Sequence, residues 1–367
     1  MGRGQAAKTA LVNFDGARAA SLRIAGVAAV SRIVRELAEA GFAETRLLLP
    51  PGDRLSAAAV EDVERLAGSM RIENMVGTAT QWLAAYPEEV VLQHAGSRLV
   101  PARLLSGEMA GEADALDPAI IRLDAPGASA EILRRTGKDG DGPVSRWLNR
   151  PVSRRISALL LHVPALRPIH ATAGTALLAG LMFAALMAGG APGLIAGALL
   201  YQAASIFDGV DGEVARATFR CSPAGAVFDT VVDVATNLLF IIGLTMNLGW
   251  SGHQNAFGLA AWGFTMFVLG LSMIAWRSLR SEGPFSLDLV KYDYLNRLPG
   301  RMWPAVLRFF TIITSRDFYA LASMLLILAG LPMVILYSFG PVTTGWILVV
   351  IAGGRTMTAS SLASRRI

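Results

Sequence analysis

The feature that most constrains the fold of this chain is an abrupt change in hydropathy near residue 170. Charged residues occur throughout residues 1 to about 145, whereas residues 170–357 contain long apolar runs. The 367 residues are 53% hydrophobic with a mean hydropathy of +0.47, but these averages conceal the difference between the two halves. Because this length suits about two domains, we expect a soluble amino-terminal domain followed by a membrane domain.

Six stretches in the second half are long or apolar enough to cross a bilayer, which needs roughly 20 helical residues. They are residues 171–189, 192–207, 225–249, 255–276, 318–337 and 341–357, of which the second and sixth are the shortest. The loops on one side of these spans have no Lys or Arg, whereas the loops on the other side and the tail have several. The positive-inside rule therefore predicts an integral inner-membrane or plasma-membrane protein with both termini in the cytoplasm.

The first half alternates between strand and helix patterns. Alternation of this kind predicts a three-layer α/β sandwich with a mainly parallel sheet. Within the helix expected at 25–41, Val27, Val30, Val34 and Leu37 share one face, and Gly41 ends it. The expected elements are strands at 8–14, 45–50 and 89–93 and helices at 25–41 and 58–68.

Four carboxylates lie between two strongly apolar segments, where charged groups are costly and usually functional. In helical conformation Asp208 and Asp211 share a face, and Asp229 and Asp233 share a face of the next helix. Two helices joined by a short loop would bring the four acids together, and cations would then have to compensate their charge. Oxygen ligands favour Mg²⁺ or Mn²⁺. The alternative is buried acids that only pair with basic neighbours.

The spacing D-x2-D-G-x2-A-R-x8-G-x3-D-x3-D resembles the signature of the CDP-alcohol phosphotransferases. This family is also called the CDP-alcohol phosphatidyltransferases. The six spans expected above would form the all-α, six-helix membrane domain that contains this signature. Every fixed position of the signature is filled, by Asp208, Asp211, Gly212, Ala215, Arg216, Gly225, Asp229 and Asp233.

The resemblance implies that an acceptor hydroxyl attacks the β-phosphorus of a CDP-linked donor and that CMP is released. It also implies a two-metal site with Asp208, Asp211 and Asp229 as ligands, and Asp233 as both ligand and general base. Donor contacts are expected from four signature residues and, more weakly, from the loop residue Ser222. The four are Gly212, Ala215, Arg216 and Gly225.

Two further arginines lie at the cytoplasmic ends of expected spans. Arg277 and Arg316 could clamp a phosphate on the acceptor, since guanidinium groups bind phosphate bidentately. One or two interfacial helices, with Trp303 at headgroup depth, are expected between 277 and 317. We interpret His170 as a capping or surface residue and the single Cys221 as a tolerated small residue.

The order of elements in the first half is similar to a nucleotidyltransferase domain, as in bifunctional enzymes that make and use CDP-inositol. The loop after the first strand, Asp15 to Ser21, has one glycine where a phosphate-binding loop has several, and Gln93-His94-Ala95-Gly96 offers no metal-binding carboxylate. We therefore expect an inactive domain that binds a partner, regulates the membrane half or supports a homodimer. An active domain using Asp15 and Arg18 and an unrelated α/β module are the alternatives.

The connection between the halves also has a recognisable pattern. Residues 138–143 read as a linker, and Leu148, Val152, Ile156 and Leu159 lie on one face of an amphipathic helix opposite several arginines. The predicted organisation is a nucleotidyltransferase-like domain at 1–140, a linker with an interfacial helix at 141–169 and a six-span phosphotransferase domain at 170–367.

The net charge and the fusion of domains bear on the partners. The net charge of +5 fits membrane-facing arginines, and no basic–aromatic module for nucleic acid is visible. The fusion favours an inositol or inositol-phosphate group, either donated from CDP-inositol or accepted by a CDP-diacylglycerol-derived phosphatidyl group, in phospholipid or polyol-phosphate synthesis. Other polyol acceptors, and a non-catalytic membrane protein that binds CDP-alcohols or nucleotides, stay open.

Overall fold

The computed structural model of the chain divides into two compact units. One contains Met1–Lys138, Arg154–Pro168 and Gly212–Cys221, and the other contains Asp139–Ser153, Ile169–Asp211 and Ser222–Ile367. These units are discontinuous in sequence, so the three continuous segments expected above stay a prediction of the domain organisation. The structure describes residues 8–77, 80, 81, 84, 92–105, 117–137, 141–280, 312 and 315–353.

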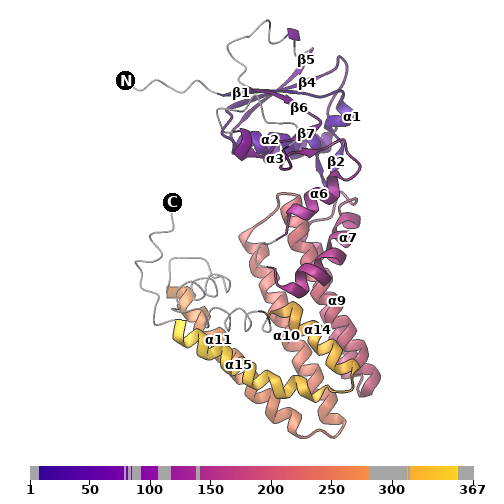
Figure 1. Cartoon of the computed structure of the whole chain (residues 1–367), viewed down its shortest axis with the longest axis vertical. Coiled ribbons are helices and arrows are strands. Elements are labelled where there is room, and N and C mark those ends of the chain that lie inside the picture. Colours follow the sequence, from indigo (N-terminus) through magenta and orange to yellow (C-terminus); the bar gives the residue numbers. More distant parts are fainter. Residues whose placement is uncertain are drawn as a thin grey trace. The chain divides into compact units, whose positions relative to one another are not determined.

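A four-stranded parallel sheet forms the centre of the amino-terminal part (Figure 1). Its strand order is β5 (Arg71–Val76), β4 (Glu44–Leu49), β1 (Thr9–Asn13), β6 (Leu92–Ala95), and each neighbouring pair is parallel. In β1 the consecutive residues Ala10, Leu11 and Val12 are all buried, as expected for a parallel strand covered on both faces. The prediction of an α/β domain with a parallel sheet is therefore confirmed.

Helices α2 (Ala29–Glu39) and α3 (Ala57–Leu66) pack against each other beside this sheet (Figure 1). The helix predicted at 25–41 begins later, because Val27 belongs to a short hairpin of β2 (Arg23–Ile24) and β3 (Val27–Ala28). Ala25 and Gly26 form its two-residue turn with φ of 45° and 82°, which is typical of a type I′ turn. The smaller elements are α1 (Ala17–Ala20), β7 (Arg98–Leu99), α5 (Ala102–Leu105), β8 (Ile121–Arg122) and α6 (Ala128–Arg135).

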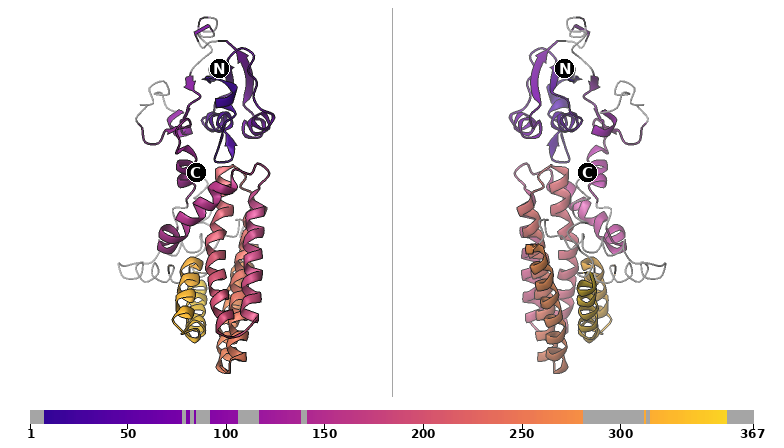
Figure 2. Two further views of the ribbon diagram at one scale, coloured as in Figure 1. Left: turned by 90° about the vertical axis from the view of Figure 1, so that its right-hand side faces the viewer. Right: turned by 90° about the vertical axis from the view of Figure 1, so that its left-hand side faces the viewer.

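Four helices of the second half are long and apolar enough to cross a membrane, counted over the described residues. They are α8 (Pro168–Met187), α9 (Gly190–Ala217), α10 (Pro223–Trp250) and α11 (Asn255–Arg280), of which α8, α9 and α10 run side by side (Figure 2). Tyr201 of α9 stacks on Phe240 of α10 with ring centroids 4.0 Å apart, and its hydroxyl donates to Asn237 Oδ1 at 2.6 Å. Aromatic packing and a partly buried hydrogen bond thus fix α9 against α10.

The last two predicted spans differ from the structure. Helix α14 (Arg316–Leu328) ends before Gly330, whose φ is 75°, and α15 (Met333–Gly353) starts just after Pro332. The predicted break at 337–341 is wrong, because α15 continues through Pro341. A glycine with positive φ followed by proline is the stronger helix stop, and the count of six spans stays a prediction.

The juxtamembrane segment consists of the π-helical η1 (Ser145–Asn149) and α7 (Arg150–Leu160). The predicted apolar face is largely exposed, with Leu148 at 41% and Leu159 at 71%, whereas Asn149, Ser153 and Ser157 are buried. Asn149 and Ser157 therefore make hydrogen bonds to other elements, whereas the apolar residues stay largely exposed, and a place for this helix at the membrane surface stays a prediction. The helices expected between 277 and 317, with Trp303, lie outside the described residues except at 277–280, 312 and 315–317.

Helices α11 and α15 run alongside each other (Figure 1). They pack closely because glycines on each helix accept aromatic rings of the other. A Cβ at Gly270 would overlap the Trp346 ring, whereas a Cβ at Gly258 on the same helix would meet nothing within 4 Å. Because close packing of small residues holds membrane helices together, Gly270→Ala is expected to lower stability by about 1–3 kcal/mol. Thermal unfolding in detergent measures this loss, with Gly258→Ala as the matched control, and equal stability of the two variants would contradict the packing.

The burial of His94 leads us to expect that the free energy of unfolding of the sheet depends on pH. His94 is 6% exposed on β6, and burial lowers its pKa from 6.5 to about 4, against a smaller opposing effect of a hydrogen bond with the backbone of Ala95. Below pH 6.5 the unfolded chain binds a proton that the folded chain excludes, so stability falls by about 1.4 kcal/mol per pH unit towards pH 4. Hydrogen exchange of β1 and β6, corrected for intrinsic rates, should show this loss, and His94→Leu should remove it. A slope that persists in His94→Leu would assign it to another group.

Candidate active site

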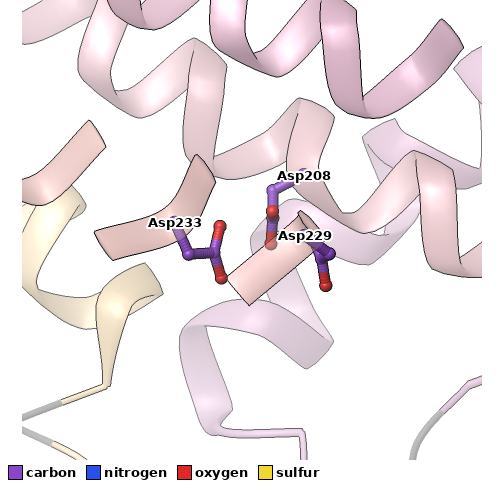
Figure 3. Close-up of side chains that lie close together, drawn as sticks. All are labelled: Asp208, Asp229 and Asp233. Carbon is purple, nitrogen blue, oxygen red and sulfur yellow. The ribbon is translucent and has the colours of Figure 1, made fainter. Parts of the chain in front are cut away.

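Three of the four signature carboxylates meet between α9 and α10 (Figure 3). Asp208 comes from α9, and Asp229 and Asp233 come from successive turns of α10. One oxygen of each lies within 4.8 Å of the others, and all three residues are half-buried. Among the described residues this is the one group of acidic, histidine or cysteine side chains with the spacing of a metal site.

The chemistry of this group fits a hard divalent cation. Its donors are carboxylate oxygens, which Mg²⁺ and Mn²⁺ prefer, and three negative charges at this spacing need a positive partner. A guanidinium group already provides one: Arg316 Nη1 lies 2.8 Å from Asp208 Oδ1 and also contacts Asp233 Oδ1. The position that attracts this guanidinium is therefore suited to a cation, and Asp208, Asp229 and Asp233 would hold it.

Arg316 reaches the acids because it is the first residue of α14. Its side chain is 12% exposed and pairs with one acid from α9 and one from α10. The sequence predicts that Arg316 binds an acceptor phosphate; in the structure it lies beside the carboxylates, and the phosphate contact stays a prediction. The side chain of Arg277, the other acceptor candidate, lies outside the described part of the chain.

Asp211 lies apart from the other three acids. It is 7% exposed, and Thr172 of α8 donates a hydrogen bond to its Oδ2 at 2.7 Å. Residues three apart on a helix differ by about 60° in direction, so Asp208 and Asp211 face different neighbours. The expectation that four carboxylates converge therefore holds for three in this structure, and Thr172 is a contact that the sequence reasoning missed.

The signature residues expected at the donor occupy the last turns of α9. The Arg216 Nε donates to the carbonyl oxygen of Thr136 at 2.5 Å. The Arg216 Nη1 lies 3.0 Å from the position that a Cβ at Gly212 would take. Gly212 thus leaves room for the side chain of Arg216, in addition to any room that it leaves for a donor. Ala215 lies half-buried on the same helix.

Ser222 and Gly225 form the start of α10. The Ser222 hydroxyl accepts a hydrogen bond from the Gly225 backbone nitrogen at 3.0 Å, and Pro223 occupies the first helical position. A serine cap and a proline at that position are a stable helix start. Ser222 therefore has a structural role as the amino-terminal cap of α10, and its contact with a phosphate stays a prediction.

A buried polar network lies next to the acid group, about one helical turn before Asp208 on α9. Asn149 Nδ2 donates to Asp317 Oδ1 at 2.8 Å and to Ser205 Oγ at 3.3 Å, and Ser205 Oγ donates to the same Asp317 oxygen at 2.9 Å. Gln202 Nε2 donates to Asn149 Oδ1 at 3.0 Å. The network joins η1, α9 and α14 and fixes the residue next to Arg316. Sequence reasoning missed it, although Asp317 was visible beside Arg316.

A second polar contact holds the backbone of the signature. Arg150 is buried and forms a double hydrogen bond with Asp141, at 2.7 and 3.0 Å, and its Nη1 donates to the Gly209 carbonyl at 3.3 Å. Gly209 directly follows Asp208, and a Cβ there would lie 3.0 Å from Arg150 Nη1. Gly209, outside the fixed positions of the signature, therefore leaves room for the Arg150 guanidinium.

Other predicted positions show no comparable arrangement. His170 is exposed on α8, as expected for a surface residue, and Cys221 is exposed. In the loop after β1 the Ala17 nitrogen donates to Asp53 Oδ2 at 2.7 Å, so a carboxylate occupies the backbone amide where a phosphate-binding loop would present it to a nucleotide. Glu213, within the signature but outside its fixed positions, is fully buried and accepts from the Ser157 hydroxyl at 2.7 Å.

Curated proteins with similar sequences have two functions in their names. The chain is 38% identical over 149 residues to the bifunctional IPC transferase and DIPP synthase of Aquifex aeolicus, covering 41% of this chain and 32% of the relative. The protein of the same name from Thermococcus kodakarensis is 36% identical over 165 residues, which are 44% of this chain and 35% of the relative. The matched part thus spans about a third of the length of these relatives.

The family model described as CDP-alcohol phosphatidyltransferase matches residues 167–353. This range is half of the chain and includes α8, α9, α10, α11, α14 and α15 with all four signature aspartates. The filled signature, the apolar helices and the gathered carboxylates agree with this match. The chain belongs to the CDP-alcohol phosphatidyltransferase family.

Proposed function

We propose that this protein is a metal-dependent CDP-alcohol phosphotransferase of the membrane. It transfers a phospho-alcohol group from a CDP-linked donor to an acceptor hydroxyl and releases CMP. The observation that carries this proposal is the group of Asp208, Asp229 and Asp233 within the range matched by the family. Such a group of acids next to apolar helices has a strong physical reason to bind cations.

The residues of the chain divide the chemistry among them. Asp233 accepts the proton of the acceptor hydroxyl while the hydroxyl oxygen bonds to the donor's β-phosphorus. The bond from this phosphorus to the bridging oxygen breaks, and CMP leaves with the electron pair. Arg216 meets the pyrophosphate charge, with Gly212, Ala215, Ser222 and Gly225 along the donor. Bound Mg²⁺ or Mn²⁺ ions, held by Asp208, Asp229 and Asp233 with Asp211 as a further candidate, would neutralise charge on the attacking and leaving oxygens.

The substrate class is an inositol-type one, in phospholipid or polyol-phosphate synthesis. The names of the relatives, IPC transferase and DIPP synthase, agree with a phospho-alcohol transfer, although the matched part covers about a third of each relative. Donor and acceptor are either CDP-inositol with a polyol or inositol phosphate, or CDP-diacylglycerol with a soluble acceptor. The site opens to the cytoplasm in a protein with six spans that forms a homodimer, and the amino-terminal domain is catalytically inactive.

CMP release from purified full-length protein tests the proposal. The protein is incubated with Mg²⁺ or Mn²⁺ and with CDP-inositol or CDP-diacylglycerol in separate reactions, each with a panel of acceptors, and the products are identified by mass. CMP release that depends on both metal and acceptor supports the transferase. Tight binding of a CDP-alcohol without CMP release across the panel would favour a non-catalytic binding protein.

Asp233→Asn should lower transfer by at least about 100-fold, because an amide cannot accept the hydroxyl proton and general-base catalysis contributes factors of this size. Donor binding, measured by calorimetry with the CDP-linked donor, should change by less than about threefold. Thr230→Val serves as the matched control, because Thr230 is exposed on the same helix and bonds to the Ala226 carbonyl of its own helix. Full activity of Asp233→Asn would remove the residue from the mechanism.

Arg316 competes with metal for the same carboxylates, since it pairs with Asp208 and Asp233. Arg316→Met should therefore raise the affinity for Mn²⁺ by up to about tenfold, or 1.4 kcal/mol, as measured by the electron paramagnetic resonance signal of free Mn²⁺. If the guanidinium also binds an acceptor phosphate, the same variant raises KM for a phosphorylated acceptor. Arg155→Met, at an exposed arginine of α7, is the control. Unchanged Mn²⁺ affinity would show that Arg316 does not compete.

A further inference from the structure

The last turns of α9 and the loop after them belong to the same compact unit as the amino-terminal domain. Residues Gly212–Cys221 group with Met1–Lys138 and Arg154–Pro168. This ten-residue stretch, called here the signature segment, contains Gly212, Ala215 and Arg216 and begins directly after Asp211. The contacts of the amino-terminal domain with the signature segment therefore bear on the donor-binding end of the site.

Arg32 makes the most buried of these contacts. It lies on α2 and is 2% exposed, and its Nε and Nη2 donate to the carbonyl oxygens of Ile24 and Ala25, each at 2.9 Å. The same Nη2 donates to the carbonyl oxygen of Ala217 at 2.7 Å. Ala217 is the last residue of α9, where carbonyl groups lack partners within the helix and attract positive charge.

Burial of the Arg32 charge costs free energy, which favourable interactions must offset. Desolvation lowers the pKa of Arg32 to about 9, against the opposing effects of Asp62 and Glu36. A buried cation is tolerated only where its donors are well satisfied. Two of its acceptors belong to the hairpin of its own domain, and the third belongs to the signature segment. Through the third bond, Arg32 also holds the end of α9, in addition to stabilising the hairpin of its own domain.

Phe219 is held by three arginines of the same domain. Its ring lies 5.4 Å from the Arg32 guanidinium carbon and 5.8 Å from that of Arg35, and its carbonyl accepts from Arg65 Nη1 at 3.3 Å. Its φ of 55° is a conformation that bulky residues rarely adopt. Surrounding contacts must stabilise a backbone of this kind, and these contacts come from α2 and α3 of the amino-terminal domain.

The amino-terminal domain also orients the arginine of the signature. Arg216 Nε donates to the Thr136 carbonyl at 2.5 Å, and Thr136 lies at the end of α6. Nearby, a Cβ at Gly26 of the hairpin would lie 2.7 Å from Leu161 Cδ2 and 3.1 Å from Thr218 Cγ2. At Gly26 the β2–β3 hairpin thus packs closely against Leu161 and against Thr218 of the signature segment.

From these contacts we infer that the amino-terminal domain is a clamp that holds the signature segment in its donor-binding conformation, with Arg32 as its central positioning residue. The clamp supplies affinity for the CDP-linked donor by pre-ordering Arg216, since a group ordered in advance loses less entropy on binding. The domain therefore contributes to transfer without chemistry of its own. The part that concerns the donor rests on the proposed function.

The single Cys221 at the end of the signature segment allows a direct test. A nitroxide label on this native cysteine in the full-length protein reports the mobility of the segment, whether or not the protein is active. Arg32→Met and Phe219→Asn should both increase the label's mobility. Asparagine at 219 tolerates the positive φ and leaves the core of the domain intact, so Phe219→Asn decides the outcome if Arg32→Met does not fold. Arg71→Met, at an arginine with a side chain 72% exposed on β5, should leave the mobility unchanged.

The kinetic part of the test separates positioning from general damage. Phe219→Asn and Arg32→Met should raise KM for the CDP-linked donor by about fivefold or more while kcat changes by less than about twofold. Unchanged label mobility in both variants would overturn the clamp, and so would increased mobility without a change in donor KM. If the wild-type protein transfers nothing, the proposed function fails, and the label alone then decides whether the domain holds the segment.

Discussion

Repulsion among Asp208, Asp229 and Asp233 is the constraint on which the rest of this structure depends. Three carboxylates whose oxygens lie within 4.8 Å of one another would push α9 and α10 apart unless positive charge were present. The helix pair is held together by apolar and aromatic packing deeper in the unit, where Tyr201 stacks on Phe240. Packing thus forces the acids together, and the acids in turn require a cation.

Buried polar side chains from outside the signature hold the signature residues and Arg316 in place through hydrogen bonds. Arg150 binds the Gly209 carbonyl, Thr172 binds Asp211, and Asn149 binds Asp317 next to Arg316. Each of these bonds joins a different element to α9 or α14. A shift of the helices that broke one of these bonds would leave a buried polar group unpaired, at a cost of about 1–3 kcal/mol. The bonds therefore favour one arrangement of the helices. The signature supplies the charges, and its neighbours supply their positions.

The sequence allowed the parts with a local signal to be predicted. The parallel sheet followed from apolar strands alternating with helices. Helical spacing in the signature predicted that four acids converge, and three of them do. The β2–β3 hairpin was missed because Ala25 adopts a positive φ that no local pattern indicates, and the start of α15 was misplaced because Pro341 proved compatible with its interior. Asn149, Thr172 and Arg32 were missed for a different reason. Their partners lie between 39 and 185 residues away in the chain, and single-sequence patterns carry no information on such pairs.

Arg316 compensates part of the negative charge of the acid group in this structure. An arginine in this position offers one positive charge to Asp208 and Asp233, whereas a divalent ion offers two and binds the same hard oxygens more compactly. A divalent ion held by these acids would take the place of the guanidinium, and the Arg316 side chain would stay within reach because Asp317, the next residue, is fixed by Asn149 and Ser205. Arg316 could then leave the acids and still remain beside them, because the hydrogen bonds that fix this end of α14 are made by the neighbouring Asp317 and not by Arg316 itself.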